Sequence, residues 1–307
     1  MQNKINALYD ALVQELPSGR VRKQERLAHH TTFKIGGPAD IFVEPMTMPE
    51  LSYVLKTIYH SGVPVTVIGC GSNILVKDGG IRGAVVSLCQ MTQIMDCNDE
   101  TLCIGAGYML KDASEFAWTN GLTGLEFAIG IPGTLGGAVF MNAGAYDGEM
   151  SRVVSFVRAV DSKGNVKEYS AKQLDFAYRH SIFHDNHEVI GEVVMTLKQG
   201  DKSAIKARMD ELTEKRELKQ PLEYASAGST FKRPPGYFAG TLIEQTGLKG
   251  LAIGDAQVSE KHAGFVVNVG NATASDVLDL IQEVQRRVLS EHGVQLEPEV
   301  RMIGEDA

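Results

Sequence analysis

Glycine is concentrated in a few short segments of this 307-residue chain, and this clustering restricts its fold more than any other feature. The chain holds 32 glycines, which is well above the usual share of about 7%. The first cluster, Gly69–Asn73 (GCGSN), directly follows the apolar stretch Val65–Ile68. The second covers 130–138 (GIPGTLGGA) and continues over 142–146 (NAGAY). Segments without bulky side chains let the backbone approach a large ligand closely, so we expect both clusters to face a ligand.

The first cluster has the composition of a phosphate-binding loop. Consecutive backbone N–H groups with small side chains form a concave anion site, and we predict that Gly69, Cys70, Gly71, Ser72 and Asn73 bind the phosphates of a cofactor. The loop is not the dinucleotide fingerprint G-x-G-x-x-G, because its sixth position is Ile74. The pattern G-x-x-x-x-G-K-[ST] is also absent from the chain. The alternative is a tight turn that needs positive φ.

The second cluster is denser, and its amides are suited to hydrogen-bond ring or phosphate oxygens of a flat cofactor. Structural turns seldom cluster twice in one domain, which favours a shared cofactor site over two unrelated turns. The residues predicted to contact the cofactor here are Gly130, Ile131, Pro132, Gly133, Gly137, Ala138, Asn142, Gly144 and Ala145.

Apolar periodicity predicts a mixture of strands and helices without strict alternation, which favours an α+β fold. Expected strands cover 39–43, 65–68, 84–87, 102–104, 153–160, 189–197 and 265–269. Expected helices begin after Thr47, near Leu110, at Lys202 and after Thr273, with Leu51, Leu55, Ile58 and Tyr59 on the apolar face of the first. The change of character near residue 200 predicts a first domain over 1–200, with its core at about 34–199. A second domain is predicted over 201–292, and residues 293–307 are expected to return to the first.

Charge and apolar patterning exclude several classes of partner. The 30 basic and 38 acidic residues leave a net charge of −8, which repels nucleic acid and anionic lipid. The N-terminal segment lacks the apolar core of a secretory signal, and no apolar run reaches the ~18 residues of a membrane span. We therefore expect a cytoplasmic protein with no nucleic-acid or membrane partner.

Metal binding is not predicted from the cysteines and histidines. Cys70, Cys89, Cys97 and Cys103 show no metal-ligand spacing and are expected to be buried thiols. The triplet His180, His184 and His187 could share a helical face, but Asp185-Asn186 is a poor helix interior and no carboxylate–histidine motif accompanies it. We expect packing or surface roles for these histidines.

A basic group surrounds a serine at the start of the second domain, in the otherwise acidic chain. Its members are Lys215, Arg216, Lys219, Lys232 and Arg233, and a doubly anionic ligand is the natural partner for them. The alternative for the first three is a solvated helix face.

Ser229 and Lys232 match the pattern S-x-x-K of penicillin-recognising serine enzymes, but the S-D-N and K-T-G motifs that this enzyme class also needs are missing. A serine that donates a proton therefore fits better than a hydrolytic nucleophile.

Arg179 stands among apolar residues of the sequence. Its charge is costly there unless an anion lies beside it, so we expect it to meet an anionic ligand.

Nine segments, in the same order and across nearly the whole chain, resemble the UDP-N-acetylenolpyruvoylglucosamine reductase family. They are TTFKIGGPAD (31–40), GCGSN (69–73), GIPGTLGGA (130–138), NAGAY (142–146), YRHS (178–181), GSTFKRP (228–234), AGTLIE…GLKG (239–250), KHAGFVVN (261–268) and LEPEVR (296–301). The short spacing between Arg179 and Ser229 resembles the subtype that lacks a tyrosine-bearing insertion.

This resemblance implies an FAD-binding domain of the vanillyl-alcohol-oxidase type, made of two α+β subdomains, followed by a smaller α+β substrate domain. It implies that NADPH reduces the flavin, which then reduces UDP-N-acetylglucosamine enolpyruvate to UDP-N-acetylmuramate in peptidoglycan precursor synthesis. Arg179 and Glu299 match the residues that stabilise the developing negative charge, and Ser229 matches the proton donor. Substrate binding is expected from Tyr178, Lys219, Lys232, Arg233 and His262, and the family is usually monomeric.

Two other readings stay open from the sequence alone. Another flavin-dependent oxidase or dehydrogenase would share the FAD domain, although the segments GSTFKRP and LEPEV argue against it. A non-catalytic module that binds nucleotide sugars would use the same basic group without any need for Ser229 or Glu299. Flavin binding distinguishes the second reading from an enzyme.

Overall fold

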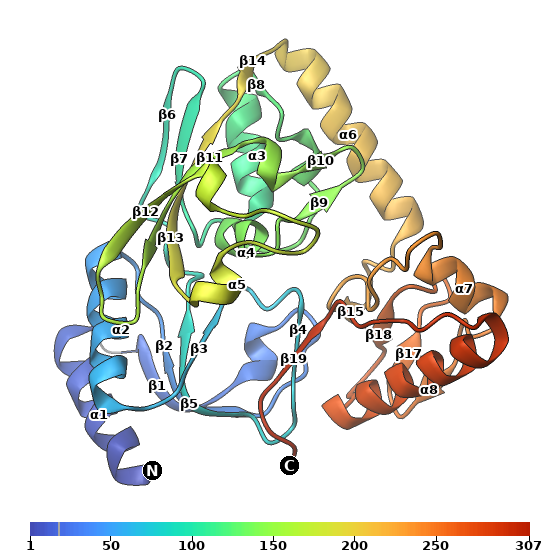
Figure 1. The fold of residues 1–307 in the computed structure, drawn as a ribbon, viewed down its shortest axis with the longest axis horizontal. Coiled ribbons are helices and arrows are strands. Elements are labelled where there is room, and N and C mark those ends of the chain that lie inside the picture. The colour runs from blue at the N-terminus through green and yellow to red at the C-terminus, as the bar shows by residue number, and fades with distance from the viewer. Residues whose placement is uncertain (18) are drawn as a thin grey trace. The chain divides into compact units, whose positions relative to one another are not determined.

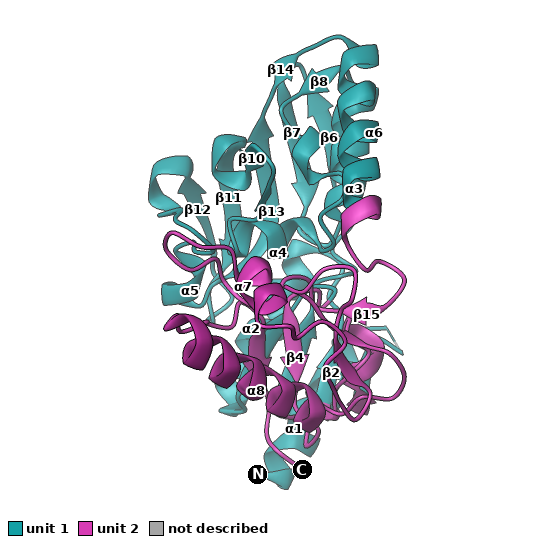
Figure 2. Ribbon diagram, turned by 90° about the vertical axis from the view of Figure 1, so that its right-hand side faces the viewer, with its two compact units in different colours: residues 1–23, 41–70, 83–216 teal, residues 24–40, 71–82, 217–307 magenta. Residues whose placement is uncertain are grey.

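The chain folds into two compact units in a computed structural model that describes residues 1–17 and 19–307. Unit 1 comprises residues 1–23, 41–70 and 83–216, and unit 2 comprises residues 24–40, 71–82 and 217–307 (Figure 2). Each unit is therefore assembled from three separate stretches of the chain.

Helices and strands are mixed along the chain (Figure 1). The α-helices are α1 (Gln2–Glu15), α2 (Met48–Ser61), α3 (Leu110–Thr119), α4 (Leu135–Phe140), α5 (Phe183–Asn186), α6 (Lys202–Lys219), α7 (Ala239–Gln245) and α8 (Ala274–His292). Short 3-10 helices cover Leu27–His30, Glu126–Ala128, Met150–Arg152 and Ala171–Gln173.

Three larger sheets and three two-stranded pairs contain the described strands. The first sheet has the order β1 (Val21–Arg26), β2 (Pro38–Val43), β5 (Ile81–Ser87), β3 (Val65–Ile68), and the second has the order β12 (Val166–Ser170), β11 (Val154–Val160), β13 (Val189–Thr196), β7 (Thr101–Gly105), β6 (Met95–Asn98). The third sheet has the order β15 (Ala225–Ser226), β18 (Val266–Asn268), β17 (Ala256–Val258), β16 (Ala252–Ile253). The pairs are β9 (Gly144–Ala145) with β10 (Gly148–Glu149), β8 (Leu122–Thr123) with β14 (Lys198–Gln199), and β4 (Ile74–Val76) with β19 (Arg301–Ile303).

Unit 1 contains two hydrophobic cores. In one, α3 and α4 pack with the antiparallel β7, β11 and β13 (Figure 1). In the other, α1 packs on α2, and the apolar face of α2 buries Leu51, Leu55 and Ile58 as predicted. Tyr59, predicted on that face, is instead 51% exposed, because it lies one position beyond the buried stripe.

Unit 2 has a single core between the sheet β15-β18-β17-β16 and helices α7 and α8. Thr273 caps α8 as predicted: its hydroxyl accepts a hydrogen bond from the Asp276 amide, and the Asp276 carboxylate accepts one from the Thr273 amide. Phe33, Ile35 and Leu75 complete this core although they precede it by about 150 residues or more in the sequence. The core of unit 2 is therefore not built from residues 201–292 alone.

The predicted boundary at residue 200 and the compact units do not coincide. The structure divides the chain within α6, after Arg216, and assigns residues 24–40 and 71–82 to unit 2. Residues 301–303 pair in parallel with 74–76, directly after the first glycine cluster. The functional division into 1–200, 201–292 and 293–307 stays a prediction.

Candidate functional site

The two glycine clusters meet in unit 1 at Gly69. This residue follows β3, and a Cβ atom on it would lie 2.4 Å from the Thr134 hydroxyl oxygen. Thr134 is the N-cap of α4, which the second cluster forms. Only glycine allows this close approach. The structure therefore brings together the start of the first cluster and the helix of the second.

Residues 71–73 of the first cluster belong to unit 2, where their backbone is held on both sides. Gly71 has φ of +66°, and a Cβ atom there would lie 2.3 Å from the His30 carbonyl oxygen. Asn73 donates from its side chain to the carbonyl of Glu299, and its own carbonyl accepts from the Arg301 amide. The geometry of Gly71 therefore fits both predictions for this loop, a tight turn that needs positive φ and a backbone surface that a ligand can approach.

The second cluster forms the short helix α4 with a close-packed inner face. The Gly136 amide donates to the Ala106 carbonyl at 2.9 Å, and a Cβ atom on Gly136 would lie 2.8 Å from that of Ala106. The buried side of α4 also includes Leu135, Ala138 and Val139. Gly136 is therefore needed for packing, and this helix was not among the predicted elements.

Arg216, from α6, lies against the start of the second cluster. A Cβ atom on Gly130 would lie 2.7 Å from the Arg216 Cδ. The Arg216 Nε is buried and has no hydrogen-bond partner among residues 1–17 and 19–307. Burial lowers the pKa of the Arg216 guanidinium from its ordinary value. Arg216 was expected in the basic group around Ser229 or on a solvated helix face, and in the structure it lies beside Gly130.

Arg179 stands at the tip of a two-residue turn in unit 1. Ala177 and His180 exchange two backbone hydrogen bonds of 3.2 Å, which leaves Tyr178 and Arg179 at the corner. Arg179 has φ of +56°, a left-handed conformation that favours glycine. Its guanidinium lies 4.9 Å from the centre of the Tyr178 ring. Strained non-glycine residues of this kind cluster at functional sites.

Two polar side chains fasten this turn to the segment around α4. Asn142 donates to the Ala177 carbonyl at 3.1 Å and accepts from the Ser151 amide at 2.9 Å. Ser181, fully buried, donates to the Phe140 carbonyl at 2.7 Å. Asn142 was predicted as a cofactor contact. In the structure its side-chain amide fixes the backbone of the Arg179 turn, a role that the sequence did not indicate.

Ser229 and Glu299 lie on two neighbouring segments of unit 2 that are joined by backbone hydrogen bonds. The Glu299 amide donates to the Thr230 carbonyl, and the Lys232 amide donates to the Glu297 carbonyl, each at 2.8 Å. Phe231 pairs with Pro298 in antiparallel register. The register places Thr230 opposite Glu299, so Ser229 is one position from the residue facing Glu299.

Lys232, Arg233 and His262, three of the predicted substrate residues of unit 2, lie on these paired segments or within two residues of a segment bonded to them. The Thr230 amide donates to the Gly264 carbonyl, two residues from His262. Lys261 donates to the carbonyl of Glu217, two residues before Lys219 at the end of α6. Lys232 pairs with Glu297 at 3.3 Å, and the Arg233 guanidinium lies 4.0 Å from the centre of the Phe238 ring. Tyr178 belongs to the Arg179 turn of unit 1.

His262 is half-buried, and its ring is held in one orientation. Its Nδ1 accepts a hydrogen bond from the Gly264 amide, and its ring meets the Phe265 ring edge to face. Burial lowers the pKa of His262 from its ordinary 6.5. A neutral imidazole with Nδ1 occupied leaves Nε2–H as a hydrogen-bond donor.

Two protein-family models match this chain, and together they include residues of both units. The model of the UDP-N-acetylenolpyruvoylglucosamine reductase C-terminal domain matches residues 220–303, and the model of an FAD binding domain matches residues 39–170. A UDP-N-acetylenolpyruvoylglucosamine reductase from Clostridium tetani is 48% identical over 295 residues, which are 96% of each chain. The chain belongs to the UDP-N-acetylenolpyruvoylglucosamine reductase family. The resemblance found in the sequence is thereby confirmed.

Other members of the reductase family agree in length and fold. The reductase from Clostridioides difficile is 48% identical, with 97% of this chain and 98% of that protein covered. The crystal structure of the reductase from Thermus caldophilus is 38% identical and superposes with a TM-score of 0.81 over 93% of this chain and 99% of that one. The predicted α+β class is confirmed.

A more distant likeness concerns the fold alone. p-Cresol methylhydroxylase superposes with a TM-score of 0.52 at 14% identity, covering 97% of this chain and 66% of that one. The predicted FAD-binding domain of the vanillyl-alcohol-oxidase type is consistent with this neighbour and with the matching FAD-domain model.

Proposed function

We propose that this enzyme uses bound FAD and NADPH to reduce UDP-N-acetylglucosamine enolpyruvate to UDP-N-acetylmuramate. Family membership over almost the whole chain, with an FAD-binding domain over residues 39–170, is the observation that carries this proposal. The reaction supplies a peptidoglycan precursor, and through it the enzyme serves cell-wall growth, cell shape and division.

The residues of the two glycine clusters fit FAD. Gly69 and Gly71 provide a backbone surface on which side chains find no room, and such a surface suits a pyrophosphate. The buried Arg216 Nε beside Gly130 lacks an acceptor, and an anionic or carbonyl oxygen of the cofactor would supply one. We assign Arg216 to cofactor binding, together with Gly69–Asn73 and the predicted residues of the second cluster. Bound FAD would take hydride from NADPH and pass it to the terminal carbon of the enolpyruvyl group.

Three residues of the chain would stabilise the charge that develops on hydride addition and donate the proton that completes the reduction. Addition to the terminal carbon places negative charge beside the substrate carboxylate, and preorganised donors lower the energy of that state. Arg179 and Glu299 would stabilise it. Ser229 would then donate its hydroxyl proton to the neighbouring carbon, so that hydride and proton together saturate the double bond.

Substrate phosphates and sugar would be bound mainly by the basic residues near Ser229. Lys219, Lys232 and Arg233 supply the positive charge, and a doubly anionic diphosphate is their natural ligand. The Nε2–H of His262 is suited to donate to a neutral or anionic oxygen. Tyr178, exposed beside Arg179, would contact the same substrate.

Further properties follow from the family and the sequence. No helix in the described part of the chain is both long and apolar enough to cross a membrane. We propose a monomeric enzyme of the cytoplasm without a nucleic-acid partner. We also propose that residues 293–307 serve the flavin site, since β19 pairs with β4 directly after the first glycine cluster.

An anaerobic titration followed by visible spectroscopy tests the proposal. The purified protein should show a flavin spectrum that bleaches with NADPH and returns when the enolpyruvyl UDP-sugar is added. If the flavin is bound and reduced but the sugar restores no colour, the substrate assignment is wrong. If no FAD binds on reconstitution, both glycine clusters have been misassigned.

A further inference from the structure

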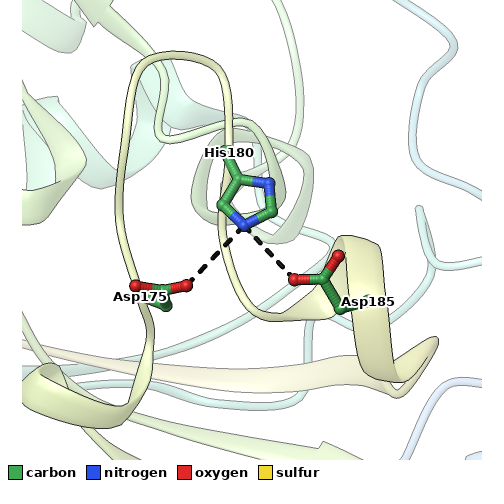
Figure 3. Close-up of side chains that lie close together, drawn as sticks. All are labelled: Asp175, His180 and Asp185. Atoms are coloured by element: carbon green, nitrogen blue, oxygen red, sulfur yellow. Dashed lines mark ion pairs between the residues drawn. The ribbon is translucent and has the colours of Figure 1, made fainter.

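We propose that Asp175, His180 and Asp185 form a binding site for a divalent transition-metal ion in unit 1. The three side chains converge from the two arms of the Arg179 turn and from α5 (Figure 3). The His180 Nε2 lies 3.4 Å from an Asp185 carboxylate oxygen and 4.0 Å from an Asp175 carboxylate oxygen. One ligand atom from each residue lies within 4.8 Å of the other two.

The donor set and its spacing suit a metal such as Zn²⁺ or Mn²⁺. Imidazole nitrogen and carboxylate oxygen bind Zn²⁺ at about 2.0–2.2 Å, which puts neighbouring ligands of a tetrahedral ion about 3.4 Å apart. The separation of His180 and Asp185 already has this value, and the Asp175 oxygen, 4.0 Å from the same imidazole nitrogen, must move closer to complete the set. Zn²⁺ should bind more tightly than Mn²⁺, in the order typical of nitrogen and oxygen ligands.

The imidazole is held in place before any ion binds. His180 stacks on His184 with ring centres 5.1 Å apart, and His184 stacks on Phe140 with ring centres 3.9 Å apart. The backbone of His180 is fixed by its two hydrogen bonds to Ala177. Neighbouring groups that fix ring orientation in this way raise metal affinity at known sites.

Charge also favours a cation at this place. Two carboxylates within 4.8 Å of each other repel, and a cation between them removes that repulsion. The side chains of Asp175 and Asp185 are 76% and 62% exposed, so water can complete the coordination and the ion can exchange with solvent. We therefore expect a reversible site with one ion per chain.

An ion bound here would join residues 175 and 185 across the segment that carries Arg179. Binding of the ion does not depend on the proposed function, because it involves none of the proposed catalytic residues. Slower local opening of residues 175–186 is the direct physical consequence.

Mn²⁺ binding by the FAD-loaded enzyme, measured by electron paramagnetic resonance of the free ion, tests the proposal. Mn²⁺ is chosen because it prefers carboxylate and imidazole to the thiols of the cysteines. The natural protein should bind one ion saturably, and His180→Gln and Asp175→Asn should each weaken binding at least tenfold. His60→Gln removes an exposed imidazole on α2 and should leave the affinity unchanged. Absence of saturable binding, or equal affinity in all four proteins, would overturn the proposal.

Hydrogen exchange supplies a readout that is separate from affinity and from turnover. Adding Zn²⁺ should slow amide exchange over residues 175–186 in the natural protein but not in His180→Gln. Protection that persists in the variant would place the ion elsewhere and contradict the assignment. A loss of sugar-dependent flavin reoxidation with normal ion binding would instead count against the proposed function alone.

Discussion

Arg179 adopts a backbone conformation that costs an L-residue about 1–2 kcal/mol relative to right-handed structure. Glycine would be the favoured residue at this corner of the turn, yet the chain has arginine. Two anchors, Asn142 and Ser181, hold the turn from either side. Strain that persists in a well-held turn points to a requirement for the side chain itself.

Arg179→Gly should separate stability from activity. Relief of about 1–2 kcal/mol of strain is offset by about 0.5–1 kcal/mol of extra backbone entropy for glycine, so the free energy of unfolding should stay equal or rise by up to about 1.5 kcal/mol. Turnover should fall by at least a hundredfold. Denaturant unfolding and steady-state rates measure the two effects, and full activity in this variant would remove Arg179 from the chemistry.

Ser229→Ala should damage one half-reaction only. Flavin binding and reduction by NADPH should be normal, because neither needs the hydroxyl proton, while reoxidation by the enolpyruvyl sugar should slow by at least a thousandfold. Stopped-flow absorbance resolves the two steps. Ser226→Ala, three residues earlier in the same segment, is the matched control and should reoxidise at the normal rate. Unchanged reoxidation in Ser229→Ala would exclude a proton-transfer role.

His262 should make the stability of the protein depend on pH. Its pKa in the folded state lies below the ordinary 6.5 because the ring is partly buried. Below pH 6.5 the unfolded chain therefore binds more protons at this residue, so stability falls as the pH decreases. His262→Gln should make the loss of stability between pH 6.5 and 5 shallower. An identical slope in denaturant unfolding at several pH values would contradict this.

At the scale of elements, α4 links three functional segments. Its N-cap Thr134 contacts Gly69, its inner face packs on Ala106, and its last residue Phe140 accepts the hydrogen bond of Ser181. Helix α4 therefore contacts both the first glycine cluster and the segment that carries Arg179.

Ser181→Ala should therefore slow catalysis as well as reduce stability. Loss of the hydrogen bond from the buried Ser181 hydroxyl to the Phe140 carbonyl costs about 0.5–1.5 kcal/mol and loosens the Arg179 turn. Turnover should fall at least tenfold with little change in FAD affinity. The control is Ser155→Ala, which removes a comparable bond to the Val194 carbonyl within the sheet of β11 and β13. If both variants lose stability but neither loses rate, the turn does not depend on this anchor.

Elements with local signals could be predicted from the sequence. Thr47 and Thr273 cap their helices as expected, because a cap depends on residues three apart. Helix α4 could not be predicted, because its glycines disfavour a helix and it depends on packing against Ala106. The position of Arg216 beside Gly130 also depends on a contact between distant segments, which periodicity does not encode.

At the scale of the whole molecule, the division into units could not be derived from composition. The change of character near residue 200 predicted a boundary there, whereas the structure divides the chain within α6, after Arg216. Residues 24–40 and 71–82 read as ordinary parts of the first domain, yet they belong to unit 2, where Phe33, Ile35 and Leu75 are buried. The family resemblance predicted the fold class and the cofactor, since it rests on motifs from both units.

A fragment of residues 201–307 should not fold by itself. It lacks three buried apolar side chains of its core, and burial of each contributes about 1.5–3 kcal/mol. That loss is comparable with the whole stability of a small domain. Circular dichroism and amide dispersion in NMR spectra should show an unfolded chain. A cooperative thermal transition of the fragment would show that residues 24–40 and 71–82 are dispensable.

The core of unit 2 joins Phe33 to Val300, so the ribosome makes its first and last members at widely separated times. Residue 300 follows residue 33 only after the whole stretch between them has been made, at about 5–20 residues per second. Until then Phe33, Ile35 and Leu75 have no final partners. The growing chain must keep these side chains from associating wrongly for many seconds, so unit 2 should gain from chaperone protection during translation.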